Sequence, residues 1–337
     1  MKTLDPIALT LQLCRIPSIT GDEAAVVECV GNLCTQLGLT VKLQAVGAAR
    51  RCNLLAHDPV TPPEVLLTTH LDTVPPFIAP TEEADLLAGR GTCDAKGAAA
   101  AMICALLQLR ALGEHRVGLL FLVGEEAVSD GAKAAVQGFA PRVKYFINGE
   151  PTQMLLASAQ KGTLTFKLAG DGVACHSAYP ELGRSAIHAL VQALHNVINE
   201  PWPDSPDLGP TTVNVGLLSG GLATNSLAPS SEARGIFRLA VPVEGIESRI
   251  RALLPPHVSY ERLGGTDPIL FHVPENEKSG VVRFGSDVPY LLPVGTPLML
   301  GPGSIHDAHT LHEHVKKADL VEATSKYAAL VQHLLRT

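Results

Sequence analysis

Three short apolar runs in the first half of the chain each end directly before acidic or imidazole side chains. The runs span residues 65–69, 117–123 and 144–148, and each is continuous and bounded by polar residues or glycine. This pattern is typical of strands that are buried on both faces of a sheet. An alanine- and leucine-rich segment, 96–112, separates the first two runs and stops at Gly113, as a helix does. The alternation predicts an α/β fold with a mainly parallel sheet flanked by helices.

The side chains that follow these runs are His70 and Asp72, then Glu125 and Glu126, and finally Glu150. Because the carboxyl ends of parallel strands form the ligand-binding edge of a sheet, we expect these groups to lie close together. Packed carboxylates repel one another, and burying even one without a partner costs several kcal/mol. A divalent metal removes this conflict, and oxygen and imidazole ligands without thiolates suit zinc, cobalt or manganese in a hydrolytic site.

Each of these groups also has a simpler interpretation when it is taken alone. His70 is compatible with a hydrogen-bonded histidine at a strand end, and the adjacent Glu125 and Glu126 with an acidic pair at a helix N-terminus. Asp94, in GRGTCDAKG, is compatible with an N-cap residue. The GxG of that segment lacks the third glycine of a dinucleotide fingerprint, which disfavours a phosphate cradle. The joint occurrence of the acids and His70 at successive strand ends favours the metal site.

From residue 164 the pattern changes to that of an α+β unit. Alternating strands are expected at 164–170, 211–218 and 232–241, with helices at 185–198 and 246–254. A buried strand returns at 296–303, and a helix is expected at 318–335. We therefore predict a discontinuous catalytic domain, residues 1–163 and 269–337, which is interrupted by a smaller domain, residues 164–268.

Composition excludes several classes of protein. The chain has 337 residues with 46% hydrophobic and 18% charged side chains, which predicts roughly two folded domains. It carries 26 basic and 33 acidic residues without a basic tract, so we expect no nucleic-acid partner. The 7 cysteines include no CxxC pair, which favours a reducing cytoplasm. The most apolar run, 98–107, is too short for a bilayer, which needs about 20 residues, so we expect neither a membrane segment nor a signal peptide.

Eight segments occur in an order and approximate spacing that resemble a known enzyme family. They are HLDTVPP, GRGTCDAKG, GEEAVSDGA, GEPT, QKG, CHSAYPELGRSAI, GGLATNSLAP and GPGSIHDAH. Together they resemble the zinc-dependent deacylases and exopeptidases that include acetylornithine deacetylase, succinyl-diaminopimelate desuccinylase and glutamate carboxypeptidase. The resemblance covers nearly the whole chain. It implies a zinc-exopeptidase-like α/β fold with an inserted α+β domain that serves as lid and dimerisation surface.

The resemblance also implies two divalent metal ions. His70 and Glu126 would hold the first ion, Glu150 and His309 the second, and Asp94 would bridge both. Zinc is the expected metal, with cobalt or manganese as alternatives. Three further histidines of the same C-terminal loop match no ligand position of the family: His306, His312 and His314.

Other roles implied by the resemblance concern catalysis and substrate binding. Asp72 would orient His70, and Glu125 would act as the general base that deprotonates the attacking water and later protonates the leaving amine. His176 would reach the partner's active site and stabilise the oxyanion, which implies a homodimer. The implied substrate-binding positions are Lys161, Tyr179, Asn225 and Arg238, with weaker support for Ser286 and Asp287. The guanidinium fork of an arginine suits a carboxylate.

Three departures from the family pattern concern substrate identity. The stretch 76–89 is short, His312 replaces the usual acid after the AH motif, and residues 235–238 are GIFR. We expect a small-molecule amidohydrolase acting on N-acyl amino acids, closest to acetylornithine deacetylase of arginine biosynthesis. Alternatives are deacylases of acylated lysine or ornithine in carrier-linked lysine synthesis, succinyl-diaminopimelate desuccinylase, and exopeptidases such as a dipeptidase or carboxypeptidase. Glu125 argues against a catalytically silent metal-binding protein, and the missing fingerprint against a nucleotide-dependent oxidoreductase.

Overall fold

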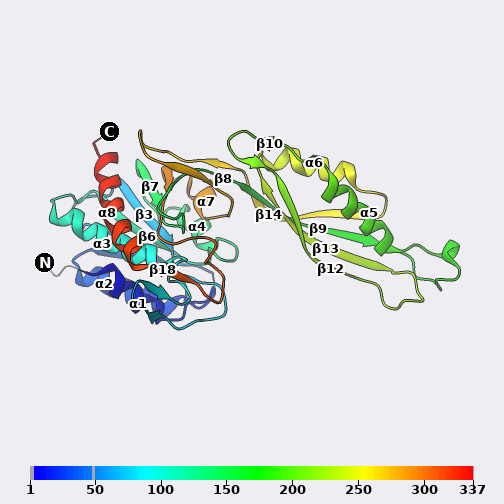
Figure 1. Ribbon diagram of the computed structural model, residues 1–337, viewed down its shortest axis with the longest axis horizontal. Coiled ribbons are helices and arrows are strands. Elements are labelled where there is room, and N and C mark those ends of the chain that lie inside the picture. Colours follow the sequence, from blue (N-terminus) through cyan, green and yellow to red (C-terminus); the bar gives the residue numbers. More distant parts are fainter. Residues whose placement is uncertain (1–3, 48–49, 337) are drawn as a thin grey trace. The chain divides into compact units, whose positions relative to one another are not determined.

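The structure is a computed structural model that describes residues 4–47 and 50–336. The chain forms two compact units (Figure 1). The first unit extends to Ser158, resumes over Phe271–Gly280, and continues from Ser286 to the C-terminal end. The second unit consists of Ala159–Leu270 and Val281–Gly285.

The first unit is built on a six-stranded sheet with the order β1-β2-β6-β3-β7-β17. Its strands are β1 (Thr40–Ala45), β2 (Cys52–His57), β3 (Val65–His70), β6 (Val117–Leu122), β7 (Tyr145–Asn148) and β17 (Thr296–Met299). Strands β6, β3, β7 and β17 are parallel, whereas β1 and β2 form an antiparallel edge hairpin. The predicted α/β class and the mainly parallel sheet are confirmed.

Four helices of this unit share one apolar core with alternate residues of the strands (Figure 1). They are α1 (Pro6–Cys14), α2 (Ala24–Gln36), α3 (Lys96–Ala111) and α8 (Lys317–Leu334). Helix α3 forms from strong helix formers, alanine and leucine, and nearly all of its first three turns are buried. Two short helices, α4 (Asp130–Ala135) and α7 (Val288–Leu291), contact each other.

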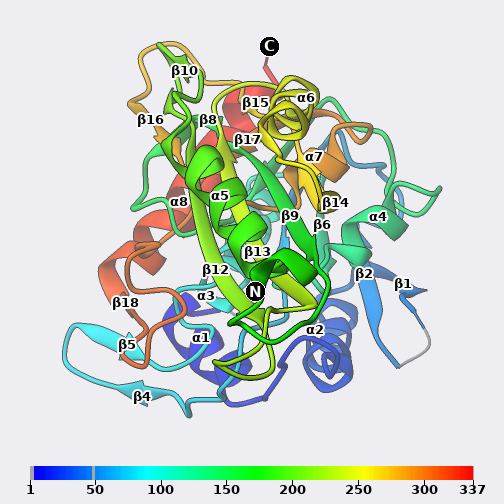
Figure 2. The ribbon, with the colours of Figure 1, turned by 90° about the vertical axis from the view of Figure 1, so that its right-hand side faces the viewer.

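A small antiparallel sheet joins distant parts of the first unit. It contains β18 (His314–Lys316), β5 (Leu86–Ala88) and β4 (Thr81–Glu82), which lie together in Figure 2. Because His314 pairs with Ala88, the loop that precedes β18 lies beside the segment that follows β5. Both of these loops carry predicted metal ligands.

The second unit contains a four-stranded antiparallel sheet with the order β12-β13-β9-β14. Its strands are β9 (Gly162–Asp171), β12 (Thr212–Gly220), β13 (Ser230–Leu239) and β14 (Val258–Thr266). Helices α5 (Ala186–Asn199) and α6 (Val243–Leu253) pack on one face, where alternate residues of β9 and β13 are buried (Figure 2). Strand β12 is an edge of this sheet, and this unit has the predicted α+β character.

The remaining elements are short. Strands β8 (Leu156–Gln160), β15 (Ile269–Leu270) and β16 (Ser279–Val282) form a three-stranded sheet, and β10 (Asp204–Ser205) pairs with β11 (Gly209–Pro210). A single 3₁₀ turn, η1, spans Pro180–Leu182. Within the described ranges, no helix combines the length and the apolar character that are needed to cross a membrane.

Candidate metal centre

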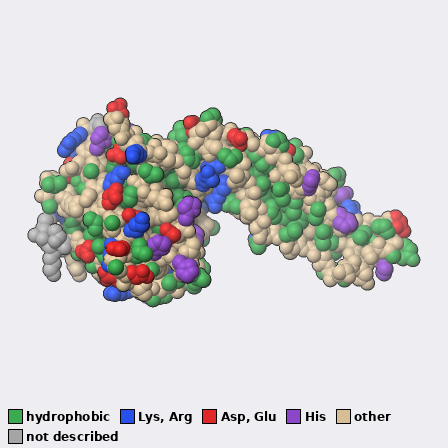
Figure 3. All heavy atoms as spheres, viewed as in Figure 1, with side chains coloured by type: hydrophobic (Ala, Val, Ile, Leu, Met, Phe, Trp, Pro, Cys, Tyr) green, Lys and Arg blue, Asp and Glu red, His purple; other side chains and the backbone are tan. Residues whose placement is uncertain are grey.

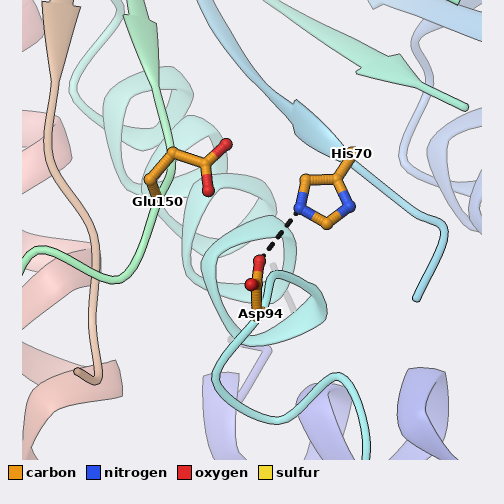
Figure 4. Close-up of side chains that lie close together, drawn as sticks. All are labelled: His70, Asp94 and Glu150. Carbon is orange, nitrogen blue, oxygen red and sulfur yellow. Dashed lines mark hydrogen bonds and ion pairs between the residues drawn. The ribbon is translucent and has the colours of Figure 1, made fainter. Parts of the chain in front are cut away.

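Strand register places His70 level with Glu150. His70 is the last residue of β3, and Glu150 lies just after the parallel neighbour β7. Thr68 faces Asn148 across the two strands, so both ligand candidates lie two residues further in the same direction. Asp94 comes from the turn before α3, and its Oδ1 lies 3.0 Å from His70 Nε2. Figure 4 shows the side chains of His70, Asp94 and Glu150 directed toward a common space.

Two groups of ligand-type side chains share Asp94. The first group is His70, Asp94 and Glu150, and the second is Asp94, Glu126 and His309; within each group the donor atoms lie within 4.8 Å of one another. His309 Nε2 lies 2.9 Å from Glu126 Oε2 and 3.3 Å from Asp94 Oδ2. Since Asp94 directs one carboxylate oxygen to each histidine, its position suits a ligand that bridges two ions.

The structure groups the two glutamates differently from the expected division between the ions. Glu150, not Glu126, lies in the group of His70, and Glu126 lies with His309. The physical reason is strand register and loop length. Leu122 is the residue of β6 that faces His70, and Glu126 lies four positions beyond it, after a turn at Gly124. Because the chain extends further beyond β6 than beyond β7, Glu126 lies next to His309 of the C-terminal loop.

The chemistry of these groups fits divalent metal ions. Each group offers one imidazole nitrogen and two carboxylate oxygens, a hard-to-borderline donor set without thiolate. Burial raises the pKa of Glu150 well above its ordinary value, and the charges of Asp94 and Asp287 act in the same direction. The carboxylates of Asp94 and Glu126 raise the pKa of His309 to about 10. The site thus concentrates negative charge that two dications would balance.

Asp72 connects His70 to the loop that carries Glu125 and Glu126. Its carboxylate accepts hydrogen bonds from the backbone N–H groups of Glu125 (3.2 Å) and Glu126 (3.1 Å) and from the hydroxyl of Thr20 (2.8 Å). His70 Nδ1 lies 2.9 Å from the carbonyl oxygen of Asp72 and 3.5 Å from its carboxylate. Donation from Nδ1 to these oxygens leaves Nε2 as the lone-pair nitrogen that faces Asp94.

Glu125 is partly buried and belongs to neither ligand group. Burial raises the pKa of Glu125 well above its ordinary value, and Glu150, Asp287 and Glu126 act in the same direction. A carboxylate that stands beside the ligands without being one of them suits a proton acceptor.

Asp287, one of the two residues with weaker support as a substrate-binding position, is buried in the first unit. Burial, opposed by the Ser129 hydroxyl and by His70, raises the pKa of Asp287 to about 7. Its charge acts on Glu125 and Glu150, so this side chain contributes to the electrostatic field of the site.

The predicted residues of the second unit form two clusters at opposite ends of its sheet. His176, Tyr179 and Asn225 are brought together because Ser177 N–H donates to the Asn225 carbonyl (2.9 Å) and the His176 and Tyr179 ring centroids lie 6.2 Å apart. They flank the end of β9 at Asp171. Lys161 and Arg238 belong to the other end, where Arg238 faces Thr163.

Arg238 has no acidic partner within the part of the chain that the structure describes, and burial lowers the pKa of its guanidinium. Lys161 is almost fully buried, and its ammonium donates to the carbonyl oxygen of Pro210. Lys161 and Arg238 therefore make their end of the sheet a candidate anion-binding site.

The three additional histidines of the C-terminal loop lie outside both ligand groups. His306 and His312 are exposed, and His314 Nδ1 lies 2.9 Å from the His312 carbonyl oxygen. Figure 3 shows several histidine side chains on the visible face of the first unit. Sequence reasoning missed Glu313 between them, a buried acid whose carboxylate contacts the segment that carries Asp94.

The α/β unit, with imidazole and carboxylate groups gathered at the carboxyl edge of its sheet, and the inserted α+β unit define a metallopeptidase-type hydrolase. Residues 66–333 match the model of peptidase family M20/M25/M40, and the chain belongs to this family. A peptidase M20 domain-containing protein of Schizosaccharomyces pombe is 35% identical over 98% of this chain and 85% of its own length. A protein of Aspergillus fumigatus named a probable carboxypeptidase is 36% identical over 96% of this chain and 85% of its own length.

Solved structures have the same fold. An aminopeptidase PepT of Bacillus cereus superposes with a TM-score of 0.83 at 19% identity, over 99% of each chain. A metallo-carboxypeptidase of the M20 family from Sulfolobus solfataricus has a TM-score of 0.78 at 15% identity, over 98% of this chain and 99% of its own. A dinuclear metal binding M20 peptidase of Bacillus subtilis has a TM-score of 0.72 at 13% identity, over 98% of each chain.

Proposed function

We propose that this protein is a metal-dependent exopeptidase of carboxypeptidase type, which releases an amino acid with a free carboxylate by hydrolysing the amide bond before it. The observation that carries the proposal is the pair of ligand groups that share Asp94. The relatives named as carboxypeptidases, which align with nearly the whole chain, favour this substrate class over the expected acetylornithine deacetylase activity.

The proposed ligands of the two ions are the groups His70, Asp94 and Glu150, and Asp94, Glu126 and His309. Zinc is the proposed metal, with cobalt or manganese as alternatives, and the pair would polarise the scissile carbonyl and the attacking water. Glu125 takes a proton from that water while the water oxygen adds to the carbonyl carbon. As the C–N bond breaks, Glu125 returns the proton to the amine, so the products are a carboxylate and a free amino acid.

The other residues bind and orient. Asp72 holds His70 and the backbone of Glu125 in position. Arg238 is proposed to bind the substrate carboxylate, because a guanidinium without an acidic partner among the described residues is suited to a bidentate contact with a carboxylate. Lys161 belongs to the same end of the sheet. His176 is proposed to stabilise the oxyanion, with Tyr179 and Asn225 lining that subsite.

We also propose a homodimer. β9 is 10 residues long, so the His176 and Arg238 clusters at its two ends are about 30 Å apart at roughly 3.3 Å per residue. One chain's second unit therefore cannot bring both clusters to one small substrate, whereas two chains related by a two-fold axis can. The free cysteines fit a proposed location in a reducing cytoplasm.

The deacetylase and carboxypeptidase hypotheses involve the same bond, an acyl group on the nitrogen of an amino acid. They differ in the acyl group that is accepted. The test is release of one amino acid from N-blocked dipeptides, free dipeptides, and N-acetyl and N-succinyl amino acids, with the metal content measured alongside. We expect the peptide substrates to have the higher kcat/KM. Hydrolysis of N-acetyl amino acids alone would overturn the carboxypeptidase assignment and restore the deacetylase.

A further inference from the structure

Glu313 is a buried carboxylate that collects hydrogen bonds from the segment before α3. It is 1% exposed and lies four residues after His309. Its Oε1 accepts from the backbone N–H groups of Gly91 (2.8 Å), Cys93 (3.2 Å) and Asp94 (3.1 Å). Its Oε2 accepts from the guanidinium of Arg90 at 2.5 Å. The Glu313 carboxylate therefore accepts four hydrogen bonds from residues 90, 91, 93 and 94 of one short turn.

The surrounding contacts keep this turn and Glu313 in fixed register. The backbone N–H of Gly89 donates to the Glu313 carbonyl oxygen (2.8 Å), and β18, which begins directly after Glu313, pairs with β5. Arg90 is itself buried, and its Nε donates to the Pro76 carbonyl oxygen (3.3 Å). Because every donor is removed from solvent, water cannot replace the carboxylate when it is lost.

The turn held by Glu313 ends at Asp94, the residue shared by the two ligand groups. One carboxylate oxygen of Asp94 faces His70 at 3.0 Å and the other faces His309 at 3.3 Å. The loop that supplies His309 therefore also anchors the backbone of Asp94, through Glu313. A shift of this loop would move ligands of both groups at once.

We propose that Glu313 is a positioning residue that fixes Asp94 as the ligand common to both metal ions. This inference rests on the proposed function and extends it to a side chain that contacts no ligand donor atom. It binds the backbone behind the ligand, as the outer hydrogen-bond partners of metal ligands do. Both metal affinities, and not one alone, depend on it.

Glu313→Gln is the informative variant because it keeps the size of the side chain. The amide oxygen can still accept from backbone N–H groups, but the amide nitrogen then faces the Arg90 guanidinium, and two donors oppose each other. The matched control is Glu322→Gln, which changes an exposed glutamate of α8 in the same way. Glu313→Asp keeps the charge but is one methylene shorter, and it provides a second test if Glu313→Gln does not fold.

The measurements are calorimetric titration of the metal-free protein with Zn²⁺, the visible absorption of the Co²⁺ form, and kcat and KM at saturating metal. We expect Glu313→Gln to bind both ions about 10–100-fold more weakly than the parent chain and the Glu322→Gln control. The Co²⁺ spectrum should change, and kcat should fall while KM stays the same. The metal affinities of Glu313→Asp should lie between those of Glu313→Gln and those of the parent chain.

A purely structural role would lower the melting temperature and leave the metal affinities and the Co²⁺ spectrum of the folded protein unchanged. That result, in Glu313→Gln or in Glu313→Asp, would overturn the inference and leave the proposed function intact. Failure of the parent chain to bind two ions would instead overturn the proposed function. The two failures are therefore distinguishable in the same titration.

Discussion

Glu125 and Glu126 are neighbours in the chain but have different surroundings. Glu126 lies 2.9 Å from His309 and belongs to a ligand group, whereas Glu125 belongs to neither group. Asp72 accepts hydrogen bonds from the backbone N–H groups of both residues, so one buried acid positions the backbone that carries both side chains. The arrangement separates a proposed metal ligand from a proposed base within two residues.

Glu125→Gln should therefore retain both metal ions and lose most of its turnover. The variant removes the proton acceptor without removing a ligand, and a general base contributes about 10²–10⁴-fold to a rate. Metal content and kcat, measured on the same preparation, check this. Glu126→Gln is the control and should lose metal. If Glu125→Gln lost metal and regained turnover when metal was added back, the two roles would be exchanged.

Arg238→Ala should weaken substrates that carry a free carboxylate more than their amides. A hydrogen bond to a charged group contributes about 1.5–3 kcal/mol, which corresponds to at least tenfold in kcat/KM. Paired substrates that differ only in carboxylate or carboxamide are the measurement, and Arg234→Ala on the exposed part of the same strand is the control. Equal losses on acids and amides would remove Arg238 from the substrate site.

The strand-end pattern predicted that His70, Glu126 and Glu150 lie near one another, because each follows a strand that is typical of a buried sheet. Asp94 and His309 follow no such strand, and only the family resemblance indicated them as ligands. The strand-end pattern could not predict whether Glu126 or Glu150 joins His70, since that depends on strand register and on the turn after β6. Glu313 was missed because its contacts with residues 90–94 join positions more than 200 residues apart. A single sequence does not distinguish such an acid from a solvated one.

The loop after β6, residues 123–129, is held in place by a glycine turn at one end and an ion-pair network at the other. Gly124 has a φ of +79°, and a Cβ there would lie 2.0 Å from Asp130 Oδ1, so this turn requires glycine. Arg51 binds Glu23 at 2.8 Å and Asp130 at 2.7 Å, and thereby ties the loop's end to β2 and to the start of α2. The loop that supplies Glu125 and Glu126 is thus held by contacts that involve no metal.

Arg51→Met should destabilise the fold strongly. It leaves Glu23, which is fully buried, without its cation, and breaking a buried ion pair costs about 3–5 kcal/mol. Urea unfolding measures the change. Arg116→Met is the control, because Arg116 is 38% exposed and solvent-exposed ion pairs contribute little to stability. Recovery of stability in Arg51→Met with Glu23→Gln would support the account, whereas equal effects of Arg51→Met and Arg116→Met would contradict it.

Elements with a long apolar run were predicted more closely than the edge strand β1. β3, β6 and α3 follow from continuous apolar sequence, and the structure places them within a few residues of the predicted limits. β1 has no fully buried residue and therefore lacks an apolar pattern. The return of Val281–Gly285 to the second unit depends on tertiary contacts, which no local pattern encodes.

Strand β12 of the second unit has an exposed apolar edge. β12 is an edge strand whose Leu217 and Leu218 are 64% and 62% exposed, and hydrophobic side chains are visible on this unit in Figure 3. An exposed apolar edge strand is a ready surface for pairing with another chain. Pairing of two copies along this edge would supply the second cluster that one chain cannot bring to its own Arg238.

Mixed dimers test whether the active site is shared. Glu125→Gln and His176→Ala homodimers should each be nearly inactive. A mixed dimer has one site with both defects and one with neither, so random exchange in an equal mixture should restore about a quarter of full activity. Differently tagged chains verify that subunits have exchanged. If exchange is complete and no activity returns, His176 acts within its own chain.

In the proposed mechanism, activity depends on two metal ions held by groups that share Asp94. The most direct measurement is turnover of an N-blocked dipeptide during titration of chelated, metal-free protein with Zn²⁺, with bound metal determined at each point. We predict no turnover without metal, binding of two ions per chain, and full recovery once both are bound. Full turnover by the metal-free protein would contradict a metal-dependent mechanism.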